Sequence, residues 1–253
     1  MYRLMVSDFI RLFRDKKIIA ASFLYFFLAD LLETIICNVG TSLDVDFYAD
    51  GLITDRGTII PFILAIFTGL FVYTDFREGT IRNKVIAGAK RWEIVGSMVV
   101  VSAVFATYLC AVKHVLGLLF GSFYKAGFSD TPGNLLTYTM IHTGSAVAIA
   151  TLFTVITYLL GTNIVGAFLP IALCVLSGVA TMIITNDLFP ENGNCRLSPE
   201  TYRIYNFIDS YLPFTYLDGM PRHGITEFYI SIGATIFISL VIGLIIFNRK
   251  DLK

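Results

Sequence analysis

Charged residues are scarce in this chain of 253 residues: they make up 15% of the sequence, whereas hydrophobic residues make up 56%. Soluble domains carry about 25% charged residues. The scarcity excludes an ordinary soluble domain and predicts a membrane protein. The formal net charge is zero, which gives no reason to expect a nucleic-acid partner.

Cysteines are too few, and too scattered, to form a disulfide framework. Cys37, Cys110 and Cys174 fall within apolar runs and are interpreted as small apolar residues, while Cys195 stands alone in a polar stretch. A bridge between Cys37 and Cys195 is left open, because Cys37 lies near the end of its apolar run.

The sequence motifs of common enzymes and ATP-binding proteins are missing. The sequence contains no G-x-x-x-x-G-K-[ST] phosphate loop, no H-E-x-x-H zinc motif and no G-x-S-x-G nucleophile elbow. His114, His142 and His223 show no spacing typical of metal ligands. The chain is therefore not expected to be an enzyme, to bind ATP through such a loop or to hold a cofactor.

Six apolar runs are long enough to cross a membrane as helices, which takes about 20 residues each. They predict an all-helical membrane protein that forms a single transmembrane domain over 1–253. The runs are 18–39, 58–75, 93–113 with an apolar extension to 120, 140–161, 164–185 and 228–247.

The basic residues of the six-span arrangement gather on one side of the membrane. That side holds thirteen of them, whereas the other side holds five basic and eleven acidic residues. Because cytoplasmic loops are rich in Lys and Arg, both chain termini are predicted to be cytoplasmic. The uncharged turn at Thr162 and Asn163 fits either side, so the even number of spans depends on the basic residues near the chain ends.

The first 17 residues predict an amphipathic helix that lies in the inner headgroup layer before the first span. One helical face carries apolar side chains and another carries polar ones: Met5, Phe9, Leu12 and Phe13 against Ser7, Arg11 and Arg14. The alternative is a solvated helix that only adds positive charge to the cytoplasmic side.

The loop 75–93 joins the second and third spans and carries five basic residues. It is predicted to form a short cytoplasmic helix, 81–87, that lies flat between Gly79 and Gly88. Apolar residues recur there at helical spacing while basic residues face elsewhere: Ile81, Val85 and Ile86 against Arg82 and Lys84.

The segment 186–227 is the longest polar stretch and is predicted to be a structured extracellular loop. Ser198 suits a helix N-cap and Pro199 the first helical position, which predicts a helix over 199–212. Its aromatic residues are expected at the outer headgroup level, either as an anchoring belt or at a substrate exit. They include Tyr202, Phe207, Phe214 and Tyr216.

Charged residues within the apolar runs are costly, at about 2.5–3.5 kcal/mol near the membrane centre. Asp30 and Glu33 share a face of the first span, and Lys113 and His114 lie toward the outer end of the third. The two groups could meet. Two interpretations stay open: a polar patch on a transport path, or structural ion pairing and snorkelling.

The order of these segments, with three short motifs, resembles the ABC-2 type permeases, the membrane subunits of bacterial ATP-binding-cassette exporters. The motifs are D-F-R-E-G-T at 75–80, K-R-W-E-I at 90–94 and F-N-R-K-D-L at 247–252. In that family an acidic residue followed by Gly-Thr marks the loop between spans two and three, here Glu78, Gly79 and Thr80. The resemblance implies a contact with a partner ATPase through this loop and its helix, including Ile81, Val85 and Ile86.

The resemblance further implies that ATP and Mg are bound by a separate ATPase subunit and that a second permease subunit, identical or different, completes the transporter. We expect an exporter in the bacterial cell membrane that moves an amphipathic or hydrophobic cargo, such as an antimicrobial peptide or a lipid. The alternative is a self-contained proton-coupled transporter or an intramembrane enzyme that uses Asp30 and Glu33.

Overall fold

The computed structural model describes residues 1–14, 16–41, 48–54, 59–124, 127–160, 164–190, 197–217 and 224–249. Within these ranges the chain is helical and has no strand, as predicted. Predictions about Thr162, Asn163 and Cys195 lie outside the described residues. The helices are α1 (Tyr2–Arg14), α2 (Lys16–Thr41), α3 (Gly51–Thr54), α4 (Ile59–Arg77), α5 (Thr80–Ile86), α6 (Arg91–Gly121), α7 (Pro132–Leu160), α8 (Ile164–Leu188), α9 (Pro199–Tyr211) and α10 (Ile225–Arg249), with a 3-10 helix η1 (Pro213–Leu217) after α9.

Six of these helices are long and apolar enough to cross a membrane: α2, α4, α6, α7, α8 and α10. They correspond to the six predicted runs. The fourth of these six helices, α7, begins at Pro132, whereas the predicted run begins at 140. Proline suits the first position of a helix. The residues that follow it are polar enough that the apolar run was predicted to start later.

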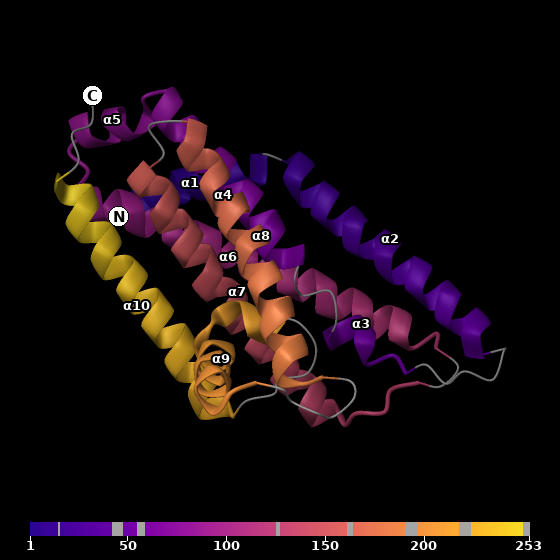
Figure 1. Cartoon of the computed structure of the whole chain (residues 1–253). Coiled ribbons are helices and arrows are strands. Elements are labelled where there is room, and N and C mark those ends of the chain that lie inside the picture. Colours follow the sequence, from indigo (N-terminus) through magenta and orange to yellow (C-terminus); the bar gives the residue numbers. More distant parts are fainter. Residues whose placement is uncertain are drawn as a thin grey trace.

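Helix α7 lies at the centre of the bundle and packs against α4, α6, α8 and α10 (Figure 1). Aromatic rings fill the space between α4 and α6, where the Phe67 and Phe105 ring centroids are 4.3 Å apart. Small residues bring other helices close together. A Cβ on Gly69 of α4 would come within 2.2 Å of the Ala167 carbonyl oxygen of α8.

Helix α1 packs against α6 at one end of the bundle, near α5 (Figure 1). The predicted apolar face is only partly right, because Leu12 is buried whereas Phe13 is 61% exposed. Arg11 was expected on the polar face with Ser7 and Arg14, yet its side chain points into the protein. The reason is that Asp8 and Leu12, four residues apart, form the face that contacts the bundle.

Helix α9 confirms the predicted structure in the segment 186–227. The Ser198 hydroxyl accepts a hydrogen bond from the Thr201 backbone N–H at 3.2 Å, and Pro199 begins the helix. Phe214 and Tyr216, which were expected at the outer headgroup level, are buried against the bundle and are therefore covered by protein rather than free to anchor in lipid. Burial raises the pKa of Tyr216 to about 12, and its hydroxyl donates to the Ser210 carbonyl at 2.6 Å.

Candidate functional site

Helix α5 stands between two glycines with left-handed backbone, as predicted. Gly79 has φ 66° and Gly88 has φ 89°, values that other residues adopt only with strain. The predicted apolar face is divided, because Ile81 is buried and Val85 packs against the core while Ile86 is 73% exposed. Positions 81 and 85 are four residues apart and share a face, whereas position 86 lies about 100° further around the helix.

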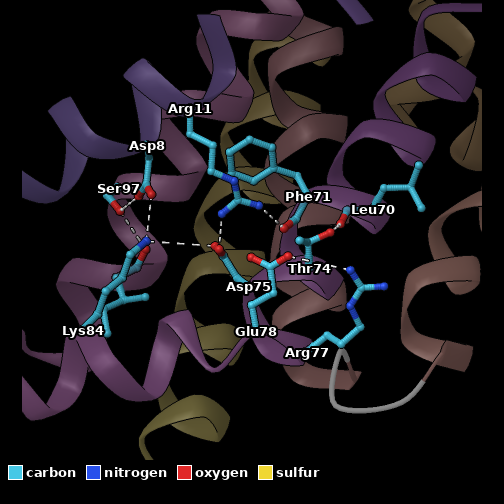
Figure 2. A network of polar contacts seen from close by, with 11 residues as sticks. Asp8, Arg11, Leu70, Phe71, Thr74, Asp75, Arg77, Glu78, Lys84 and Ser97 are labelled. Carbon is cyan, nitrogen blue, oxygen red and sulfur yellow. Dashed lines mark hydrogen bonds and ion pairs between the residues drawn. The ribbon is translucent and has the colours of Figure 1, made fainter. Parts of the chain in front are cut away.

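Lys84 also departs from the prediction. It was expected on a different face from the buried apolar residues, but its side chain also points inward, toward α1 (Figure 2). Its Nζ donates to Asp8 Oδ1 of α1 at 2.7 Å. The other oxygen of that carboxylate, Oδ2, accepts from the Ser97 hydroxyl of α6 at 2.8 Å. Asp8 thus joins three helices through two short contacts.

A second buried carboxylate lies beside the first, on α4. Asp75 is 1% exposed and accepts a hydrogen bond from Arg11 of α1, and its Oδ2 is 4.0 Å from Lys84 Nζ. Arg11 also donates to the Phe71 carbonyl at 2.8 Å, and its guanidinium carbon lies 3.7 Å from the centre of the Phe71 ring (Figure 2). The planar guanidinium suits this combination of carboxylate and ring contacts.

We name Asp8, Arg11, Asp75, Lys84 and Ser97 the four-helix polar cluster, because they come from α1, α4, α5 and α6. Its two carboxylates balance its two cations. A buried charge costs several kcal/mol unless it is paired and hydrogen-bonded. The pairing explains how two aspartates can be buried at this end of the bundle.

The same loop also contacts the last helix. Arg91 Nη1 donates to the Phe247 carbonyl at 2.8 Å and to the Asn248 carbonyl at 3.0 Å. These carbonyls belong to the last turn of α10, where a cation is favoured by the helix dipole. The segment from Asp75 to Arg91 is therefore bonded to both the first and the last helix of the bundle.

The residues of the E-G-T motif lie on the surface side of this cluster. Glu78 is exposed, and its carboxylate is 3.7 Å from Arg77 Nη2. An exposed ion pair at this distance contributes little to folding stability. Gly79 makes the left-handed turn, and Thr80 begins α5. The motif thus shapes the entry into α5, while the buried ion pairs hold the helix.

The charged residues predicted near the outer ends of the first and third spans are placed as follows. Asp30 and Lys113 are both buried, on helices α2 and α6 that pack together, while Glu33 is partly exposed. Lys113 Nζ donates to the Ile53 carbonyl of α3 at 2.6 Å. The pairing of Asp30 or Glu33 with Lys113 stays a prediction.

The fourth member of that predicted patch, His114, has a neighbour that the sequence did not single out. Its Nε2 is 3.2 Å from Nδ1 of His142 on α7, and its Nδ1 is 2.6 Å from the Cys110 carbonyl. The two imidazole rings are stacked with centroids 5.4 Å apart. Among the residues that the structure describes, no group of three His, Cys, Asp or Glu could hold a metal ion.

Sequence reasoning missed Asp8, Ser97 and His142 as site residues, and it treated Asp75 only as the end of a span and the first residue of a motif. One signal was available for Asp8, because it lies on the same helical face as Leu12, where an acidic residue needs a partner. Nothing local marks Ser97, whose partner is 89 positions away.

Comparisons with known proteins identify no family for this chain. No protein-family model matches the sequence, and no curated protein matches it. Function must therefore be inferred from the residues and their geometry.

Proposed function

We propose that this chain is the membrane subunit of an ATP-driven exporter in the bacterial cell membrane. The observation that carries the proposal is the anchoring of α5: two buried cation–carboxylate contacts fix it to α1 and connect it to α4. A force applied to α5 by a partner would be passed to these helices and, through Ser97, to α6. The six apolar helices and the E-G-T motif fit the same interpretation.

The partner is a separate ATPase subunit that holds ATP and Mg, and it contacts the outward side of α5. That side presents Ile86 together with the exposed Arg82 and Asn83. Ile81 and Val85 are covered by the protein itself and serve to hold α5 in place. A second permease subunit completes the transporter, and the cargo is amphipathic or hydrophobic, because few charged residues lie within the six spans.

In this proposal α1 lies in the inner headgroup layer and both chain termini are cytoplasmic. Support comes from the basic residues, thirteen of which fall on one side of the six-span arrangement. The hydrogen bond from Arg91 to the last turn of α10 also supports this placement of the C-terminus. It brings the end of the last helix to the same end of the bundle as α1 and α5.

Substitution of Ile86 by aspartate tests the ATPase contact. We expect Ile86→Asp to weaken binding of the ATPase subunit about 30-fold, as removal of a central contact residue does, without lowering the amount of inserted chain. Val85→Asp, one residue away, should instead lower the amount of folded chain because Val85 packs inward. Both are measured by co-purification from membranes, normalised to the permease. Full ATPase binding by Ile86→Asp would contradict the proposed contact.

Labelling of single cysteines tests the orientation. In a variant without native cysteines that is expressed without the ATPase subunit, Arg82→Cys on α5 should react with a membrane-impermeant maleimide only after the cells are opened. Glu200→Cys on α9 should react in intact cells. Both positions are exposed, whereas Lys84 is too buried to serve as a labelling site. Labelling of position 82 from outside intact cells would overturn the orientation.

A self-contained proton-coupled transporter is the second candidate, favoured by the burial of Asp30 within the long apolar helix α2. Purified chain reconstituted alone in liposomes separates the two functions. Transport driven by a pH gradient and abolished in Asp30→Asn would support this candidate, and transport that requires an ATPase subunit would support the exporter.

A further inference from the structure

Helix α2 is packed more loosely than the central helices of the bundle, with 22% of its span buried against 61% for α7. It packs against α6 and touches α1, while an apolar groove of about 380 Å³ separates it from α4. In Figure 1 it runs along one flank of the bundle. Many of its large apolar side chains are exposed, among them Phe23, Leu24, Leu28 and Leu32.

A second apolar groove, of about 610 Å³, runs between α2 and α6, and it begins at a cation. Five of its six lining residues come from α2 and one from α6: Lys16, Ile19, Ala20, Phe23, Leu24 and Tyr108. The Tyr108 hydroxyl donates to the Ile19 carbonyl at 3.1 Å, so its polar atom is engaged within the protein. The Lys16 ammonium is the one charged group among the six lining residues.

The order of these residues along α2 places charge at one end and hydrocarbon at the other. Lys16 begins the helix at the end of the bundle that holds α1, and Leu24 lies about 12 Å further along the axis. Arg14, at the end of α1 and two residues before Lys16, is a second exposed cation beside the start of α2. A cation at headgroup level attracts anionic lipid.

We propose that this groove binds one anionic phospholipid from the leaflet that holds α1. The phosphate lies at Lys16, and one acyl chain follows Ile19, Ala20, Phe23 and Leu24. The inference does not depend on the exporter assignment, because it uses only the groove, its charge and the spanning helices.

A second copy of the chain fits the groove less well. In a two-fold symmetric pair the same surface faces itself, so an interface across this groove would place Lys16 opposite Lys16 and Arg14 near Arg14. Like charges in such positions oppose association. An anionic headgroup instead complements the basic end, and a hydrocarbon chain complements the remainder.

Native mass spectrometry of the full chain, purified in detergent and offered equal amounts of phosphatidylglycerol and phosphatidylcholine, tests the proposal. We expect Lys16→Gln to lower the retention of phosphatidylglycerol about fivefold and to leave phosphatidylcholine unchanged. Ala20→Trp should reduce the retention of both lipids by filling the groove. Lys90→Gln is the matched control, because Lys90 is an exposed cation at the N-cap of α6 and lies outside the groove.

Equal loss of phosphatidylglycerol in Lys16→Gln and Lys90→Gln would overturn the site and leave only general attraction of anionic lipid. A disulfide-linked dimer of Leu24→Cys, made in a variant without native cysteines and formed in membranes, would overturn it in favour of a second copy. Because Lys16→Gln changes an exposed side chain, it tests the proposal even if Ala20→Trp fails to fold.

Discussion

The Lys84→Met variant is expected to lose about 3–5 kcal/mol of folding stability, because it leaves the buried Asp8 carboxylate without its ammonium partner. Lys84 Nζ is 2.7 Å from Asp8 Oδ1 and 4.0 Å from Asp75 Oδ2, so one substitution removes the cation nearest to Asp8 and one of two beside Asp75. Unfolding in detergent, followed by near-ultraviolet circular dichroism against temperature, measures the loss as a lower midpoint.

Arg82→Met is the matched control, since it removes an exposed cation from the same helix and should change stability by about 0.5 kcal/mol or less. The double variant Lys84→Met with Asp8→Leu should be more stable than Lys84→Met alone, because it also removes the orphaned carboxylate. Equal midpoints for Lys84→Met and Arg82→Met would show that the buried pair contributes nothing.

The second large effect is expected from a single methyl group at Gly69. A Cβ at this position would lie 2.2 Å from the Ala167 carbonyl oxygen, and backbone atoms of a packed helix cannot shift cheaply. Gly69→Ala should therefore force α4 and α8 apart and destabilise the bundle by about 1–3 kcal/mol or more. The yield of monodisperse protein after heating in detergent reports the change.

Gly178→Ala in α8 is the control with the opposite expected sign. No atom lies within 4 Å of the added Cβ there, so alanine should be neutral or stabilise the helix by up to about 1 kcal/mol. If both glycine variants behaved alike, the close approach of α4 and α8 would be wrong.

The six long helices could be predicted from the sequence because the requirement is local: about 20 consecutive apolar residues must cover the hydrocarbon thickness. The same holds for α9, whose start is encoded by Ser198 and Pro199, and for α5, whose limits are encoded by Gly79 and Gly88. Each of these signals lies within a few residues of the element that it defines.

The candidate site could be predicted only in part. The loop 75–93 was located by its basic residues and its motif, yet Lys84 and Arg11 were expected on the polar faces of their helices, apart from the buried apolar residues. In the structure both point inward, and Ile86 is the apolar residue of α5 that faces outward. The alternation of apolar and charged side chains shows that a helix is amphipathic, but a short helix with three apolar positions has more than one face that could be buried.

Tertiary structure alone decided which charges meet. Lys84 and Asp8 are 76 positions apart, and Arg11 and Asp75 are 64 apart, so no spacing in the sequence relates them. The rotation of α1 and α5 about their axes is set by the free-energy cost of burying unpaired charges. That cost depends on partners from α1, α4, α5 and α6, so it is defined only when all four helices are in place. The sequence by itself determined how many helices are long enough to cross the membrane, because hydrophobic length belongs to each segment separately.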